Sequence, residues 1–292
     1  MREVRVASTC VVCGETNNEG AERATVHSNV RAFRAERFGV WRCRACACIH
    51  AAEDAALGHY YEHYPFHDLP ADIRVRCLHA NQLGRLRRAG VRREHDVLDY
   101  GSGEGAFVGF LRKSGYQRTQ GYDPYSKRFA EPQVLQGQYD CVFSQDCIEH
   151  VDEPLALLDR FDELTRPGGV IAIGTPDAEA IDLRRPEAFA HTLHAPYHRH
   201  ILAQRALVEA GERRGWRLER AYPTMYSNTR VPFLNERFYR HYLSATDDTL
   251  DALVEPVRAA PLLARLPQTL FYGIFGSFFS RRTDISVIFR KP

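Results

Sequence analysis

The sequence predicts an α/β domain with a mainly parallel sheet, preceded by a small cysteine-rich module. Strand-like apolar segments alternate with amphipathic helix-like segments from residue 96 onward, which is typical of a parallel sheet covered by helices. A glycine-rich turn joins the first of these strands to the first helix. Two C-x-x-C pairs lie near the N-terminus. We therefore divide the chain into a module at 1–50, a helical linker at 51–95 and a main domain at 96–292.

Composition narrows the class of protein. The chain has 292 residues of which 44% are apolar, enough to bury a core, and a formal net charge of only +2. That charge disfavours a nucleic-acid partner. The N-terminus lacks the apolar core of a signal peptide, and no uninterrupted apolar segment is long enough to span a bilayer. We expect a cytoplasmic protein with no transmembrane segment.

The N-terminal cysteines predict a structural zinc site. Each C-x-x-C forms a turn that aims two thiolates at one point, so two such turns complete a tetrahedral set without an open position. The predicted ligands are Cys10, Cys13, Cys43 and Cys46. Reduced cysteines packed as small hydrophobic side chains are the alternative, and Cys48 or His50 lies close enough to replace one ligand.

The linker is rich in tyrosine and histidine. Residues 54–64 predict a helix that ends before Pro65, and residues 71–89 predict a second helix with arginines near its C-terminal end. Tyr60, Tyr61 and Tyr64 either pack between the module and the main domain or line a substrate cleft between them.

The main domain begins with the stretch Val97–Gly105, a short apolar strand followed by three alternating glycines. Glycine allows positive φ angles and close approach to a ligand, and the helix that follows presents free N–H groups. Asp123 lies about 20 residues further on, where nucleotide-binding folds place a ribose-binding carboxylate. The stretch therefore predicts a site for a nucleoside cofactor. The elements expected after it are a helix at 104–114, a strand at 118–123, an irregular piece at 124–138, a strand at 140–144, a helix at 153–165, a turn at 166–169 and a strand at 170–174.

Four motifs in this region resemble those of the class I S-adenosylmethionine-dependent methyltransferases. Asp99–Gly105 is similar to that family's D/E-x-G-x-G-x-G motif, and Tyr122-Asp123 to its ribose-binding acid. Gln145–Val151 resembles the D-V-L-E-H-V signature after the fourth strand, and Leu164–Gly169 the L-x-P-G-G turn before the fifth. The resemblance implies a Rossmann-like, seven-stranded, mostly parallel sheet whose last strand is antiparallel. An NAD-dependent dehydrogenase would instead carry G-x-G-x-x-G, whereas alanine follows Gly105 here.

The same resemblance implies how the donor S-adenosylmethionine is held. The glycines pass close to its methionine part, Asp99 orients its ammonium group, and Asp123 binds the ribose diol. The segment 132–137 has no acid, so no adenine contact is assigned there. The full set of implied donor-binding residues is Asp99, Tyr100, Gly101, Ser102, Gly103, Gly105, Asp123, Pro124, Gln145, Asp146 and Cys147.

The ribbon of paired cysteines followed by a Tyr-rich helix resembles a subgroup that methylates sugars, natural products and other small molecules. Sugar C-methyltransferases of that subgroup carry a Tyr-His-Glu-His motif after the fifth strand. Here the corresponding run Pro196–His200 has Arg199 in place of the glutamate, and at 292 residues the chain is too short for the large C-terminal domain that those enzymes carry. We therefore favour O-methylation of a small-molecule acceptor, with C- or N-methylation as alternatives.

Histidines after the fifth strand are the candidates for a general base, because the histidine pKa lies near working pH. Four occur there, and we favour His200 or His198, with Tyr197 as a positioning hydroxyl. Another interpretation uses Asp146, Glu149 and His150, which are similar to an E-x-x-E-H set that binds a divalent cation in some ubiquinone-pathway O-methyltransferases.

The C-terminal part contains two further strands, at 216–220 and 284–290, and an aromatic-rich insertion at 223–283. The insertion is interpreted as a helical cover or homodimer contact, a substrate lid, or a weak membrane-surface contact. Two other functions stay open for the whole chain. One is a ribosomal or transfer RNA methyltransferase that binds RNA through the zinc ribbon, and the other is a donor-binding subunit without activity.

Overall fold

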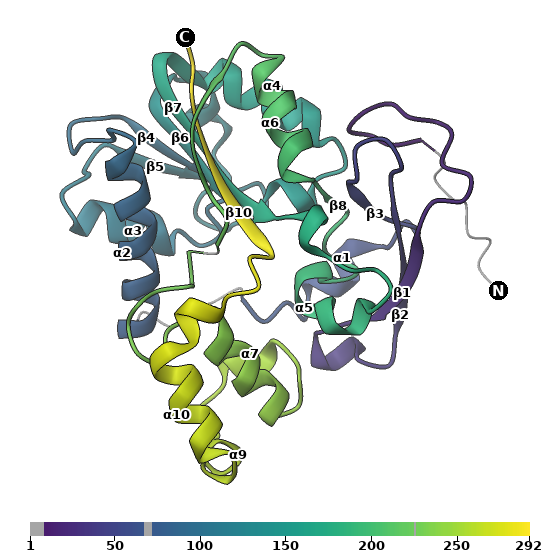
Figure 1. The fold of residues 1–292 in the computed structure, drawn as a ribbon. Helices are drawn as coiled ribbons and strands as arrows, with labels where there is room; N and C mark the ends of the chain where they lie inside the picture. The colour runs from purple at the N-terminus through teal and green to yellow at the C-terminus, as the bar shows by residue number, and fades with distance from the viewer. Residues whose placement is uncertain (1–8, 67–71, 225) are drawn as a thin grey trace.

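The structure is a computed structural model that describes residues 9–66, 72–224 and 226–292. Residues 1–8 of the predicted module, Ala71 of the predicted linker helix and Met225 of the insertion therefore lie outside the described residues. The strands form two sheets, seen in Figure 1. The smaller has the order β1-β2-β3-β8, with β1 Arg23–His27, β2 Arg37–Arg42, β3 Ile49–Ala51 and β8 His200–Ile201. The larger has the order β5-β4-β6-β7-β10-β9, with β4 Val97–Tyr100, β5 Thr119–Tyr122, β6 Tyr139–Gln145, β7 Thr165–Pro176, β9 Arg217–Tyr222 and β10 Asp284–Arg290.

The larger sheet confirms the predicted fold class. β5, β4, β6 and β7 are parallel neighbours, and β10 runs antiparallel to both β7 and β9. Parallel strands need helical crossovers, and these supply the layers on the two faces of the sheet. The helices are α1 Leu57–Tyr61, α2 Ile73–Arg88, α3 Ala106–Lys113, α4 Pro154–Leu164, α5 Ala190–Leu193, α6 Gln204–Glu212, α7 Glu236–Ala245, α8 Asp251–Val254, α9 Ala259–Ala264 and α10 Leu266–Phe275.

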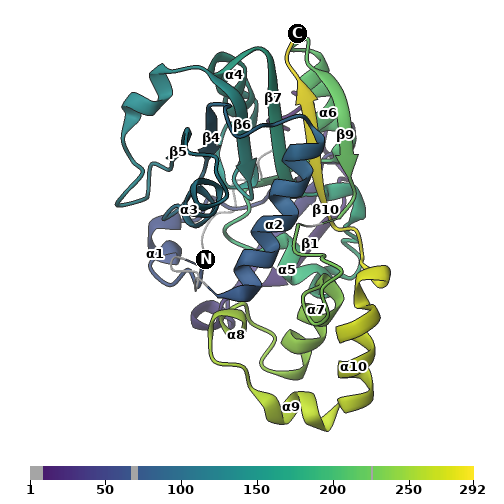
Figure 2. The same ribbon diagram turned by 90° about the vertical axis from the view of Figure 1, so that its left-hand side faces the viewer.

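Alternate residues of the strands point to opposite faces, and each face has its own core. Cys141 and Phe143 of β6 pack in the cluster that contains α2 and α3 residues, whereas Val142 packs with Phe161 of α4 and Leu207 of α6. Figures 1 and 2 show α2 and α3 on one side of the sheet and α4 and α6 on the other. The carboxyl ends of β4, β5 and β6 are therefore left free to form a site.

The strand count differs from the seven expected, because the described residues supply six strands to this sheet. The segment after β5 forms a 3₁₀ helix at Pro132–Gln136 instead of a strand. Proline cannot donate a ladder hydrogen bond. The Tyr139 hydroxyl donates to the Val134 carbonyl oxygen at 2.6 Å, which holds this segment back against the start of β6.

β7 also starts earlier than expected. The predicted turn at 166–169 is the first part of the strand, which runs from Thr165 to Pro176. The Gly168 N–H donates to the Lys291 carbonyl oxygen and the Lys291 N–H donates to the Gly169 carbonyl oxygen, both at 3.0 Å. The end of the chain therefore extends the strand pairing beyond the predicted boundary.

The smaller sheet contains residues from distant parts of the chain. β1, β2 and β3 come from the N-terminal module, but β8 follows the histidine-rich segment of the main domain. β3 pairs antiparallel with β8 through Ile49 with Ile201 and His50 with His200. This pairing fixes the N-terminal module against the segment that carries the predicted general base.

Candidate functional site

The glycine turn after β4 is built from left-handed backbone. Gly101, Gly103 and Gly105 have φ angles of +80°, +52° and +81°. A Cβ at Gly101 would lie 2.8 Å from the Cys147 sulfur, so this position also needs glycine for space. The turn thus brings the end of β4 against the loop after β6, as expected for a cradle that passes close to a ligand.

Two carboxyl groups flank this turn. Asp123 accepts hydrogen bonds from the Gly103 N–H at 3.0 Å and from the Tyr125 N–H at 2.9 Å. Asp99 is only 4% exposed, and burial raises its pKa to about 7, with a further contribution from the Asp123 carboxylate. The Ser102 hydroxyl is buried without a hydrogen-bond partner among the described residues. A buried acid and an unpaired hydroxyl fit the ammonium and hydroxyl groups of an S-adenosylmethionine molecule, because such groups supply the missing charge and hydrogen bonds.

The loop after β6 supplies the remaining predicted donor contacts. Gln145 donates from its amide nitrogen to the Asp146 carboxylate at 2.7 Å, and Asp146 has a positive φ of +51°. Surrounding protein atoms raise the pKa of Asp146 to about 6, although the residue keeps an exposed surface. Tyr100 and Pro124 lie at the same end of the sheet. Tyr100 is the last residue of β4, and Pro124 lies two residues after the end of β5. The sequence-predicted donor residues therefore lie at one end of the parallel strands.

A buried polar cluster lies next to this end of the sheet and contains Glu149, His150, His194 and His198. Glu149 is fully buried and accepts a hydrogen bond from the Thr175 hydroxyl at 2.9 Å. Its other carboxylate oxygen, Oε1, has no hydrogen-bond partner in the described part of the chain and lies 3.9 Å from Nε2 of His198. Burial raises the pKa of Glu149 well above its ordinary value. We call these four residues the Glu149 cluster.

The hydrogen bonds of two of the three histidines assign their tautomers. Nδ1 of His198 lies 2.9 Å from the Thr192 carbonyl oxygen, and Nδ1 of His150 lies 3.1 Å from the Tyr197 carbonyl oxygen. Because a carbonyl oxygen only accepts, Nδ1 carries the proton in both rings and Nε2 is an acceptor. Burial lowers the pKa of His150 to about 4 and that of His194 and His198 well below the ordinary value. The three rings are therefore neutral at working pH and can accept a proton.

Tyr61 connects the Glu149 cluster with the strand ends that carry the predicted donor-binding residues. We call these strand ends the donor edge. Its hydroxyl lies 3.1 Å from Nδ1 of His150, and its ring stacks on Tyr125, two residues beyond Asp123, at a centroid distance of 6.1 Å. Tyr64 packs on the same side, with its ring 5.7 Å from that of His194. The aromatic linker segment thus contributes side chains to the site, Tyr61 from the end of α1 and Tyr64 from beyond it, because the helix ends earlier than the predicted residue 64.

Tyr197 and His200 lie differently from His198. The Tyr197 ring stacks on His194 at 4.6 Å, but its hydroxyl donates to the Tyr60 carbonyl oxygen at 2.8 Å. His200 lies in β8, where its Nδ1 is 3.0 Å from Nδ1 of His50. His50 in turn contacts the Cys10 sulfur through Nε2 at 3.2 Å. The structure therefore brings His198 to the Glu149 cluster and places His200 beside the cysteines.

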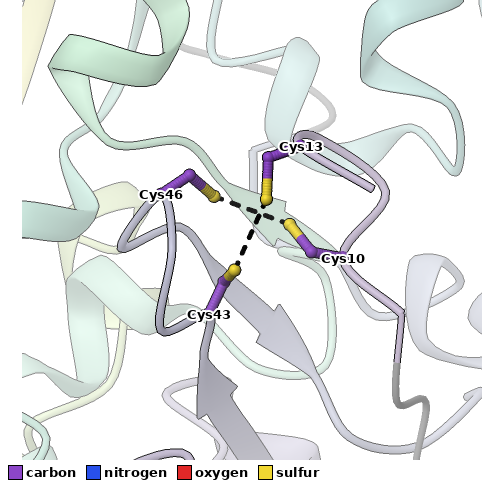
Figure 3. A group of neighbouring side chains, drawn as sticks. All are labelled: Cys10, Cys13, Cys43 and Cys46. Carbon is purple, nitrogen blue, oxygen red and sulfur yellow. Dashed lines mark hydrogen bonds between the residues drawn. The ribbon is translucent and has the colours of Figure 1, made fainter. Parts of the chain in front are cut away.

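The four N-terminal cysteines converge on one point (Figure 3). The sulfur atoms of Cys10 and Cys46 are 3.5 Å apart, and those of Cys13 and Cys43 are 3.6 Å apart. A tetrahedral zinc–thiolate centre with bonds of about 2.3 Å has sulfur–sulfur separations of roughly 3.8 Å. The donor set and its spacing therefore fit a zinc ion.

The residues that could bind a divalent cation differ from the set Asp146, Glu149 and His150 that the sequence predicts. Ligand atoms of Glu149, His150 and His198 lie within 4.8 Å of one another, and Asp146 is not part of this group. Sequence reasoning also missed Asn29, whose side-chain oxygen contacts Nδ1 of His194 at 2.7 Å, and Asp284, a buried acid whose pKa burial raises to about 7. The only local indication that Asp284 could be functional was its position as a polar residue at the start of an otherwise apolar strand.

Comparison with known proteins identifies the family. A family model described as a methyltransferase domain matches residues 61–221, which is more than half of the chain. The chain belongs to this family and is a class I S-adenosylmethionine-dependent methyltransferase. No curated protein matches the chain.

Several solved structures are distant likenesses. A Galdieria sulphuraria protein proposed to be a sarcosine dimethylglycine methyltransferase is 18% identical, with 73% of this chain and 86% of that chain covered and a TM-score of 0.45. An S-adenosylmethionine-dependent methyltransferase from Mesorhizobium loti is 15% identical, with 72% and 98% covered and a TM-score of 0.42. A Burkholderia thailandensis 1,6-didemethyltoxoflavin-N1-methyltransferase is 14% identical, with 87% and 95% covered and a TM-score of 0.41.

Proposed function

We propose that this methyltransferase acts on a hydroxyl group of a small molecule, such as a sugar, a glycan precursor or a natural-product scaffold, and that His198 is its general base. The observation that carries the proposal is that Nε2 of His198 lies 3.9 Å from Oε1 of Glu149, an oxygen without a hydrogen-bond partner among the described residues. Tyr61 joins this pair to the donor edge. His198 therefore replaces His200 as the preferred base.

In this proposal the chain's own residues hold the donor and prepare the acceptor. When bound, S-adenosylmethionine supplies an electrophilic methyl group on its sulfonium sulfur. Asp99 binds its ammonium group and Asp123 its ribose hydroxyls. Neutral His198 accepts the acceptor's hydroxyl proton on Nε2, and the Thr192 carbonyl oxygen keeps that nitrogen unprotonated beforehand. The Glu149 carboxyl group stabilises the imidazolium that results.

The cysteine module has a structural role in this proposal. A zinc ion held by Cys10, Cys13, Cys43 and Cys46 would join the turn before β1 to the turn between β2 and β3. β3 pairs with β8, which begins two residues after His198. The metal therefore acts on catalysis only through the position of the chain. We also propose that this module ends near residue 50, as the sequence predicts.

The test is a methylation screen with labelled S-adenosylmethionine on pools of metabolites, with RNA as a separate arm. We expect label in small molecules with wild type, and a loss of at least about 100-fold with His198→Ala. That variant should still bind S-adenosylhomocysteine in calorimetry. His191→Ala is the matched control, because its ring pairs with the exposed Asp248. Label that enters RNA would contradict the proposed substrate class.

Product analysis separates the remaining alternatives. A methyl group on nitrogen or carbon would refute O-methylation while leaving the family unchanged. The cation alternative has its own discriminating outcome, because Glu149, His150 and His198 are close enough to share an ion. If a chelator abolished turnover while the cysteine-bound zinc stayed in place, His198 would be a ligand and not the base.

A further inference from the structure

Exposed apolar side chains gather at one end of the molecule. Among the described residues, nine of the fifteen large hydrophobic side chains classed as exposed lie between residues 257 and 279. Phe278, the most exposed of them, keeps 74% of its surface accessible. Such a concentration marks an interaction surface. This α10 surface consists of Val257, Leu263, Leu266, Leu270, Phe271, Ile274, Phe275, Phe278 and Phe279.

The α10 surface is the outer side of an element that is already packed on its inner side. Thr269 and Gly273 are the buried residues of α10. Thr269 contacts Nε2 of His241 on α7 at 2.9 Å, and a Cβ at Gly273 would lie 2.3 Å from the Phe233 ring. Figures 1 and 2 show α9 and α10 at the end of the molecule opposite the C-terminus. The inner side of α10 is therefore packed against the protein through small residues, whereas its outer side carries the exposed apolar side chains.

The charged residues within the segment that carries this surface all have one sign. Residues 256–283 contain four arginines and no aspartate, glutamate or lysine. Arg258 pairs with Glu255 and Asp247. Within the described residues Arg265, Arg281 and Arg282 form no ion pair with a carboxylate. The apolar surface is thus bordered by positive charge that the chain itself does not neutralise.

We propose that the α10 surface docks on an anionic lipid surface. Aromatic and leucine side chains bordered by arginines are the composition that lies in the interface of a bilayer, where the apolar groups enter the acyl boundary and the cations meet lipid phosphates. A second copy of this chain fits less well, because it would add a second set of unpaired arginines to the interface and no carboxylate from the same segment. The docking is peripheral, since no helix of the described residues is long and apolar enough to cross a membrane.

Sedimentation with vesicles tests this proposal on the full chain. One vesicle is phosphatidylcholine alone, and the other contains phosphatidylcholine and phosphatidylglycerol in equal parts. We expect binding to the second vesicle, weakening with added salt. The double variant Phe275→Ser/Phe278→Ser should reduce the partition coefficient by at least about tenfold. Arg265→Gln/Arg282→Gln should weaken binding to the anionic vesicle as well.

The control is Leu218→Ser, which removes an exposed apolar side chain from β9 outside the α10 surface. It should bind as wild type does. Equal vesicle binding by wild type and the phenylalanine variant would overturn the proposal, as would no binding to either vesicle. A dimer in light scattering that dissociates on Phe275→Ser/Phe278→Ser, without vesicle binding, would assign the surface to a second copy and overturn it too. Circular dichroism establishes that each variant is folded.

Discussion

Replacing Asp99 by asparagine should stabilise the unliganded protein at alkaline pH while removing its donor affinity. The buried carboxyl group has a pKa of about 7 in the folded chain against an ordinary value of 3.8. As pH rises, the unfolded chain therefore releases this proton first, and folding becomes less favourable. The free energy of unfolding falls by about 1.4 kcal/mol per pH unit between these values, or about 4 kcal/mol in all. Asparagine does not ionise, so the variant lacks this loss.

Urea unfolding of wild type and Asp99→Asn at about pH 5 and about pH 8 measures the effect. The variant's advantage over wild type should grow by about 3 kcal/mol between these conditions, because about two pH units of the titration fall between them. Glu163→Gln, at an exposed carboxylate of α4, is the control and should show no such change. Calorimetry with S-adenosylhomocysteine should show weak or no binding by Asp99→Asn. A stability difference that is independent of pH, or donor affinity equal to that of wild type, would refute this reasoning.

Three further outcomes follow from the site. Gly101→Ala should lower the free energy of unfolding in urea by about 2–4 kcal/mol, and Gly103→Ala by about 1 kcal/mol. Both variants place alanine in left-handed backbone, but only the alanine at 101 would overlap a neighbouring side chain. Equal losses of stability would contradict this overlap. Thr175→Val should destabilise by about 1–3 kcal/mol, since it leaves a second oxygen of fully buried Glu149 without a donor; a melting temperature equal to that of wild type would argue against that hydrogen bond. Wild type should release about one zinc ion per chain to a chromogenic chelator, with a lowered melting temperature, and Cys10→Ser should release less; metal-free wild type of unchanged stability would refute the structural zinc.

The donor edge could be predicted because each part of it is encoded locally. Asp99 lies near the end of an apolar strand, the three glycines begin directly after that strand, and Asp123 directly follows the next strand. Parallel strands bring such ends together whatever the rest of the chain does. Two local differences occur: the seventh strand implied by the resemblance is replaced by a proline-led 3₁₀ helix at Pro132–Gln136, and β7 includes the predicted turn at 166–169.

The acceptor side could be predicted only in part, because its contacts join distant residues. His194 meets Asn29 across 165 residues, and the Tyr197 hydroxyl meets Tyr60 across 137. His198 and His200 differ by two positions, so the alternation of an extended segment places their side chains on the same side by pattern alone. Their surroundings differ because β8 pairs with β3, and nothing near His200 in the sequence announces that strand partner.

The residue before the short strand β8, Arg199, also bears on how the molecule unfolds. The Ala51 N–H donates to the Arg199 carbonyl oxygen at 2.9 Å, and the Arg199 N–H donates to the Glu149 carbonyl oxygen at 2.7 Å. The N-terminal module and the loop of the buried acid are thus hydrogen-bonded in series through a single residue. Separation of the module would therefore break the backbone hydrogen bonds that lead to Glu149. We expect the module and the loop of Glu149 to unfold together, as one cooperative unit.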